Sequence, residues 1–189
     1  MNKKALVLAI FLIGLIAIPA AGQINRHHIG LVLGYAKLID DDVKPLGYDF
    51  SNSGHAALTY RYSITPNVDL AVEARGTASM QEVGGNDLNL LNSYFGPGVR
   101  VIAPQNNLKL FLQGNFYFVG EEVETVSGNT TTTISEDGVG FGVNGGVDIR
   151  LSRLLSLPIE INFLYAKPSD NISGFGLSTG LTFNFGMMP

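Results

Sequence analysis

Three histidines are the residues whose chemistry has to be tested first, because the chain contains no cysteine. Acyl transfer or hydrolysis needs a histidine beside a serine or an acid. His55 is followed two positions later by Ala57, and no predicted strand carries a histidine and a serine as neighbours on one face. The adjacent His27 and His28 lack a third metal ligand. The sequence therefore predicts no catalytic residue, no metal site and no cofactor.

The other ionisable residues that could take part in chemistry lie at alternate positions inside otherwise apolar segments. Alternate residues of an extended chain point to one face. Charges that share the inside of a narrow fold must be paired or hydrated. We therefore predict a structural network of ion pairs, most of it in one half of an enclosed interior. Its members are five cations and four anions: Arg61, Arg75, Arg100, Lys109, Arg150, Asp69, Glu73, Asp148 and Glu160.

The segments that position these charges are best seen in residues 138–151. There valine, phenylalanine, isoleucine and leucine alternate with glycine, asparagine, aspartate and arginine. This period of two indicates a β-strand with one apolar and one polar face. The pattern recurs along the chain, and Pro97 predicts a bulge or kink in the fourth segment. The eight predicted strands are 28–38, 54–63, 68–79, 91–102, 108–119, 138–151, 156–166 and 173–185.

The connections between these strands alternate between tight turns and long polar segments. The long ones are predicted at 39–53, 80–90, 120–137 and 167–172. Short turns on the periplasmic side and longer loops outside are typical of transmembrane barrels. A soluble barrel or sandwich is the alternative, but the polar face is too poor in charge for a solvated surface. The predicted fold class is all-β: an eight-stranded antiparallel up-and-down transmembrane β-barrel.

The amino terminus has the layout of a secretory signal peptide. Lys3 and Lys4 precede an apolar run shorter than the ~20 residues that a spanning helix needs. Small residues follow, and we predict cleavage after Gly22. The domains are then a signal peptide at 1–22 and a barrel at 23–189, exported through the periplasm to the bacterial outer membrane.

Composition excludes some partners. The net charge is −4 and no basic cluster is present, so a nucleic-acid partner is not expected. The triplet from Asp40 to Asp42 has the charge to attract Ca²⁺, but a solvated loop is the favoured interpretation. The lumen and the outer loops remain as the places where function would be found.

The segment from Gly180 to Phe185 reads Gly-Leu-Thr-Phe-Asn-Phe, and Gly180, Phe183 and Phe185 form a Gly-x-x-Phe-x-Phe pattern. With this ending the chain resembles the small eight-stranded outer-membrane barrels of the OmpA and OmpX type. The resemblance implies that these three residues act as an assembly signal. It also implies contact with the barrel-assembly machinery, periplasmic chaperones, outer-membrane lipid and lipopolysaccharide, and a monomeric state. The four residues after Phe185 depart from the family, whose members usually stop on the aromatic.

Three functions stay open from the sequence alone. The favoured one is a structural or surface-interaction protein with a largely closed, ion-paired lumen that acts through its outer loops. A narrow pore for small solutes is the first alternative. A lipid A-modifying enzyme is the second, disfavoured because no catalytic set is found.

Overall fold

The computed structural model describes residues 27–38, 52–83, 86–105, 107–127, 130–168 and 172–186. All eight predicted strands are present. The predicted signal peptide and the Asp40–Asp42 triplet lie outside the described residues. The strands are β1 (His27–Leu38), β2 (Asn52–Thr65), β3 (Val68–Val83), β4 (Asn86–Gln105), β5 (Leu108–Ser127), β6 (Thr130–Arg150), β7 (Leu155–Lys167) and β8 (Ile172–Phe185).

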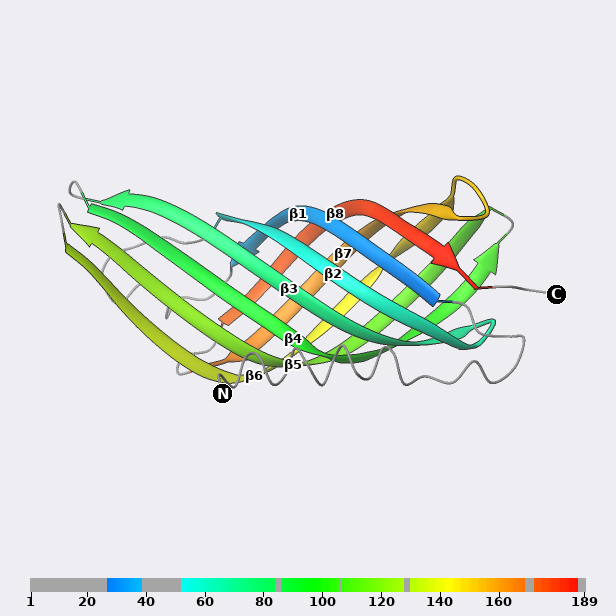
Figure 1. The fold of residues 1–189 in the computed structure, drawn as a ribbon, viewed down its shortest axis with the longest axis horizontal. Helices are drawn as coiled ribbons and strands as arrows, with labels where there is room; N and C mark the ends of the chain where they lie inside the picture. Colours follow the sequence, from blue (N-terminus) through cyan, green and yellow to red (C-terminus); the bar gives the residue numbers. More distant parts are fainter. Residues whose placement is uncertain are drawn as a thin grey trace.

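The strands form one closed barrel in sequence order (Figure 1). Each strand is antiparallel to its neighbours, and β8 closes the ring by pairing with β1. Closure leaves no unpaired edge along the wall. This confirms the predicted all-β, up-and-down barrel. Among the described residues, no helix has the length and apolar character to cross a membrane.

The two faces of the wall have opposite chemistry. Leu112 and Leu181 on the outer face are 59% and 42% exposed, whereas Glu73 on the inner face is 2% exposed. The period-two alternation of the sequence produces this division, because successive side chains of a strand point to opposite faces. Apolar side chains therefore cover the outside, and polar side chains fill the inside.

The strands β3 to β6 are longer than the sequence pattern predicts. The expected long loops at 80–90 and 120–137 are wrong, because the β3–β4 ladder continues to Val83 and Asn86 and the β5–β6 ladder to Ser127 and Thr130. These added residues project beyond β1, β2, β7 and β8 at one end of the barrel (Figure 1). We call this four-stranded projection the extension; it comprises 79–83, 86–92, 120–127 and 130–138. The projecting segments have no regular alternation of apolar and polar residues, so they lack the pattern that predicts the strands of the wall.

The predicted bulge at Pro97 is also wrong. Pairing of β4 with β5 skips Gly96 and Pro97 and resumes at Gly98 in the same register as at Phe95. Proline has no N–H to donate to a ladder, but its ring faces outward and requires no inserted residue. The irregularity of the wall lies instead between Ser63 and Thr65 of β2.

The two ends of the barrel differ. Tight turns connect β2 to β3, β4 to β5 and β6 to β7, and all three lie at the end opposite the extension (Figure 1). Backbone bonds brace them, for example from Leu151 N to Leu155 O at 3.0 Å. We call this the turn end, and the opposite end the extended end.

Candidate functional site: the ion-paired lumen

Six of the nine predicted lumen charges form one chain of ion pairs inside the barrel. Negative and positive groups alternate along it, so the chain is neutral as a whole. All six residues are buried. In order they are Glu73, Arg75, Glu160, Arg100, Asp148 and Arg61.

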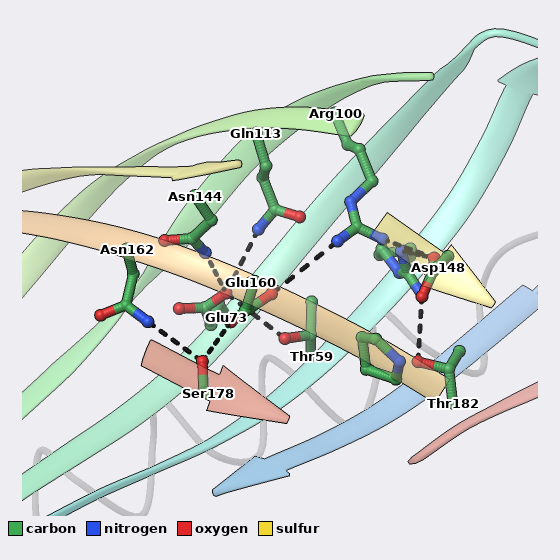
Figure 2. A network of polar contacts seen from close by, with 12 residues as sticks. Thr59, Glu73, Arg100, Gln113, Asn144, Asp148, Glu160, Asn162, Ser178 and Thr182 are labelled. Carbon is green, nitrogen blue, oxygen red and sulfur yellow. Dashed lines mark hydrogen bonds and ion pairs between the residues drawn. The ribbon is translucent and has the colours of Figure 1, made fainter. Parts of the chain in front are cut away.

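Glu73 on β3 is the first centre of this network (Figure 2). Its Oε1 accepts from Arg75 Nε at 2.8 Å and from the Tyr117 hydroxyl at 2.6 Å. Its Oε2 accepts from Gln113 and Asn144 side-chain amides at 3.2 and 3.3 Å, and from the Thr59 hydroxyl at 3.3 Å. Five donors therefore converge on one buried carboxylate. Hydrogen bonds to a charged acceptor are the strong ones, so this group fixes its surroundings.

Asp148 on β6 is the second centre, nearer the turn end. Its Oδ2 accepts from Arg61 at 3.3 Å and from Arg100 at 3.1 Å. Arg61 also donates to the Thr182 hydroxyl. The Arg100 guanidinium carbon lies 3.4 Å from the ring centroid of Phe111, which adds a cation–π contact. Arg100 links the two centres, because its other terminal nitrogen is 4.0 Å from Glu160 (Figure 2).

Several of these pairs connect opposite walls of the barrel. Arg61 on β2 reaches Asp148 on β6, and Arg75 on β3 reaches Glu160 on β7. Each of these strand pairs is separated by three intervening strands in the ring. The pairs therefore brace the barrel across its diameter rather than along its wall.

The remaining three predicted members lie outside this chain. Asp69 is buried and accepts from the Ser63 hydroxyl at 2.6 Å. Lys109 is half-buried and lines a cavity at the turn end. The placement of Arg150 in the inner network is wrong. It is exposed, and its Nε donates to the backbone oxygen of Ser152, because β6 ends there and its last side chain reaches the mouth.

An apolar cluster fills the lumen toward the extended end. Tyr117 belongs to both regions, because its ring packs in this cluster while its hydroxyl binds Glu73. Its ring meets Tyr94 edge-on at 5.7 Å between centroids. The other members come from β4, β5, β7 and β8: Leu88, Leu90, Val119, Leu164, Ala166 and Ile172.

The sequence missed a histidine–serine contact that spans two strands. His28 Nε2 on β1 lies 3.1 Å from the Ser63 oxygen on β2, and the Ser63 hydroxyl donates to Asp69 on β3. His28 Nδ1 lies 2.6 Å from the Asn184 side-chain oxygen. Inspection of single strands cannot find such a contact, because the three residues come from three strands. The acid contacts the serine and not the histidine, so the order differs from that of a hydrolytic triad.

The other two histidines lie in different surroundings. His27 stacks on Phe185, with ring centroids 5.6 Å apart, and its Nδ1 lies 2.6 Å from the Tyr60 hydroxyl. His55 is buried in the lumen. Among the described residues, no group of three or more histidine and acidic side chains has the arrangement of a metal site.

The residues of the expected assembly signal lie on the strand that closes the ring. Gly180 is paired with Val32 of β1, and Phe183 with Ile29. The inner wall of this seam leaves no room at Gly180, where a Cβ atom would lie 1.9 Å from the Leu31 carbonyl oxygen. Phe183 and Phe185 are exposed on the outer face.

Aromatic side chains gather at two levels of the outer wall. Near the extended end, Phe141 lies 5.2 Å from Tyr165, and Phe163 lies 5.0 Å from Phe175, between ring centroids. Phe185 and its neighbours form the level at the turn end. Two such levels are typical of barrels whose apolar band meets the two interfaces of a lipid bilayer.

Comparison with known proteins finds solved structures with a similar architecture. The Neisserial surface protein A (NspA) structure superposes with a TM-score of 0.65 at 15% identity, covering 84% of this chain and 97% of NspA. The attachment invasion locus protein Ail of Yersinia pestis, in complex with the heparin analogue sucrose octasulfate, gives 0.58 at 16% identity, covering 84% and 99% of the two chains. OprG from Pseudomonas aeruginosa gives 0.55 at 11% identity, covering 86% and 96%.

At these identities the structures show a shared fold. A search of curated proteins finds no match. The model of the outer membrane protein beta-barrel domain matches residues 7–185, which is most of the sequence. The chain therefore belongs to the outer membrane protein beta-barrel domain family, and is a β-barrel of the bacterial outer membrane.

Proposed function

We propose that this barrel is a surface-interaction protein that contacts a positively charged partner through the extension, and that its lumen is closed. The extended end then faces the outside of the cell, as the short-turn rule for outer-membrane barrels predicts. The observation that carries the proposal is the extension itself, because no wall-forming role requires strands of 20 and 21 residues. A tilted strand crosses the hydrocarbon in about 9–11 residues.

The charge of the extension indicates what kind of partner it binds. It carries seven acidic residues and neither lysine nor arginine: Glu82, Asp87, Glu121, Glu122, Glu124, Glu136 and Asp137. Complementary potentials steer association and exclude partners of like charge. The Ail structure holds a heparin analogue, which is a polyanion. A polyanion is the wrong partner for this extension, and a basic protein surface is the right one.

One border of the extension also offers backbone groups. Ladder pairs between β6 and β7 begin at Val139 and Lys167, so residues 130–138 of β6 pair only with β5 in the described part of the chain. An unpaired strand edge can accept a strand from another protein. Four threonines followed by Ile134 suit such pairing, because β-branched residues favour strands.

The binding proposal is tested with a basic peptide on the barrel in lipid nanodiscs. The triple variant Glu82→Gln, Asp87→Asn, Glu122→Gln removes three exposed charges of the extension. We expect it to weaken binding of a lysine-rich peptide at least tenfold, because each lost carboxylate reduces the local potential. The measurement is calorimetric titration at low ionic strength.

The matched control replaces Asp40, Asp41 and Asp42 by asparagine, which removes the same charge from a different segment. We expect this control to bind within about twofold of the parent protein. If both triple variants weakened peptide binding equally, the effect would come from the net charge of the protein, and the extension would be rejected as the contact surface.

The packing of the lumen supports the closed state. The apolar cluster, the Glu73 group and the Asp148 group follow one another from the extended end toward the turn end. Each places buried side chains inside the barrel. A narrow pore needs a hydrated path past all three. To open such a path, a buried arginine–carboxylate pair would have to break, which is strongly unfavourable.

Closure is tested by recording currents from the purified barrel in a planar bilayer. We expect no steady conductance from the parent protein. The variant Asp148→Ala leaves Arg61 and Arg100 without their shared partner, so we expect it to give frequent openings. Steady conductance from the parent protein, equal to that of the variant, would contradict the closed lumen.

Catalysis is not part of the proposal. The single proton of the Ser63 hydroxyl is donated to Asp69, and His28 is held by Asn184. The contact faces the lumen and not the lipid, whereas a lipid-modifying site needs access from the bilayer.

A further inference from the structure

A cavity of about 870 Å³ occupies the turn end of the barrel. Its inner limit is the pair between Arg61 and Asp148, which closes the lumen side. Its rim is formed by the β6–β7 turn, which contributes Arg150, Arg153 and Leu154, all exposed. We call this cavity the vestibule. It lies between the mouth of the barrel and the Asp148 group, two of whose members, Arg61 and Asp148, line it.

The charges that line the vestibule are unequal. Four are cationic (Arg61, Lys109, Arg150 and Arg153) and two are carboxylates (Asp69 and Asp148). The chain as a whole has a net charge of −4, so the positive excess of this cavity opposes the overall balance. A concave site lined by one sign of charge concentrates its field and attracts ions of the other sign.

The two carboxylates cannot neutralise the rim. Asp148 Oδ2 is shared by Arg61 and Arg100. Asp69 accepts the Ser63 proton. These contacts hold both acids at the inner end of the vestibule, while two guanidinium groups stand at its mouth.

The rim arginines retain most of their donors. Toward the described residues Arg150 uses only Nε, on the Ser152 backbone oxygen at 3.3 Å. Arg153 makes no hydrogen bond or ion pair within the described part of the chain. A guanidinium presents five N–H donors in a planar fork that matches carboxylate and phosphate oxygens. Two such groups at one mouth are suited to a ligand with two or more anionic oxygens.

The size and the lining of the vestibule restrict the kind of ligand further. Cavities of about 300–1,000 Å³ hold ligands of the size of a small organic molecule, and a lone phosphate ion would leave most of this space unfilled. Ile102 and Leu154 supply apolar wall, and His28 and Asn184 supply polar groups deeper inside. The occupant therefore combines an anionic group with an organic body.

We propose that the vestibule is a binding site for a small organic anion that carries phosphate or carboxylate groups. The anionic group lies between the Arg150 and Arg153 guanidiniums, and the organic body extends toward Ile102 and Leu154. The source of the anion is either a soluble metabolite at the mouth or the headgroup of an anionic lipid. This inference is independent of the extension and its partner.

The test titrates inorganic pyrophosphate into the barrel in nanodiscs of zwitterionic lipid. We follow the arginine Nε–H resonances by NMR and the heat of binding by calorimetry. We expect saturable binding that weakens with salt. The double variant Arg150→Gln, Arg153→Gln should weaken it at least tenfold, which is about 1.4 kcal/mol. Both residues are exposed, so folding is retained and is checked by heat-modifiable migration on a gel.

The matched control is Lys37→Gln, Lys167→Gln, which removes two exposed cations from the opposite end of the barrel. We expect it to leave pyrophosphate binding within twofold. Non-saturable titration, or equal loss in both double variants, would overturn the proposal. Discs that contain phosphatidylglycerol then identify the source. If pyrophosphate binding is reduced there, the anion is a lipid headgroup, and unchanged binding identifies a soluble solute.

Discussion

Replacing Glu73 by alanine should lower the free energy of unfolding by about 3–5 kcal/mol, the range for breaking a buried ion pair by removing one partner. Five donors lose their acceptor at once, among them Arg75 and Tyr117. Arg75 would keep only Glu160, at 3.4 Å. Glu73 is 2% exposed, so bulk water does not reach this carboxylate. The measurement is equilibrium unfolding in urea, with the folded fraction read from gel migration.

Two further variants make this prediction specific. Tyr117→Phe removes one of the five donors, and should cost about 1.5–3 kcal/mol, the value of a single hydrogen bond to a charged group. Glu122→Ala removes an exposed acid of the extension and should change stability by less than about 0.5 kcal/mol. If Glu73→Ala were as mild as Glu122→Ala, the carboxylate would not be the centre of the network.

Replacing Gly180 by alanine should prevent normal closure of the ring. The added Cβ would lie 1.9 Å from the Leu31 carbonyl oxygen and 2.6 Å from the Val32 Cα atom. Both are backbone atoms of β1, so no side chain can rotate away, and β1 and β8 would have to separate. We expect a cost of at least about 3 kcal/mol, the upper end of what overpacking usually costs. The folded fraction after refolding should fall severalfold.

Gly114→Ala is the matched control for this seam, because no heavy atom lies within 4 Å of its Cβ position. Its folded fraction should equal that of the parent protein or exceed it, since alanine restricts the unfolded chain. Equal folded fractions for Gly180→Ala and Gly114→Ala would contradict the steric requirement at the seam. The experiment also separates packing at Gly180 from recognition, because purified protein refolds without assembly machinery.

The wall of the barrel was predictable from the sequence, and the extension was not. Period-two alternation is strong wherever one face meets lipid, as from Leu108 to Val119, and it located all eight strands. Residues 120–127 and 130–138 have no such contrast, because they project beyond the part of the wall whose outer face is apolar. The sequence therefore predicts a loop where these glutamates and threonines lie. The bulge expected at Pro97 fails for a related reason. The proline leaves the register unchanged because its ring lies on the outer face, and the presence of a proline in the sequence does not by itself indicate this.

The sequence predicts which charged residues lie in the lumen, but it does not predict how they pair. Alternation placed Glu73, Arg75, Glu160, Arg100, Asp148 and Arg61 on the inner face. The partner of each charge depends on the register of all eight strands, which the sequence of one strand does not contain. Arg61 and Asp148 are 87 residues apart in the chain. The contact of His28 with Ser63 was missed for the same reason.

The braces between opposite walls have a consequence for how the molecule forms. A hairpin of two strands pairs its own backbone, but a charge of a cross-barrel pair, such as Arg61 or Asp148, does not meet that partner until the facing wall arrives. In lipid such an unmatched ion is costly, so hairpins would not enter the bilayer one after another. The ring should instead close in a single cooperative event, late along the folding route and slow because its decisive contacts are distant in the chain.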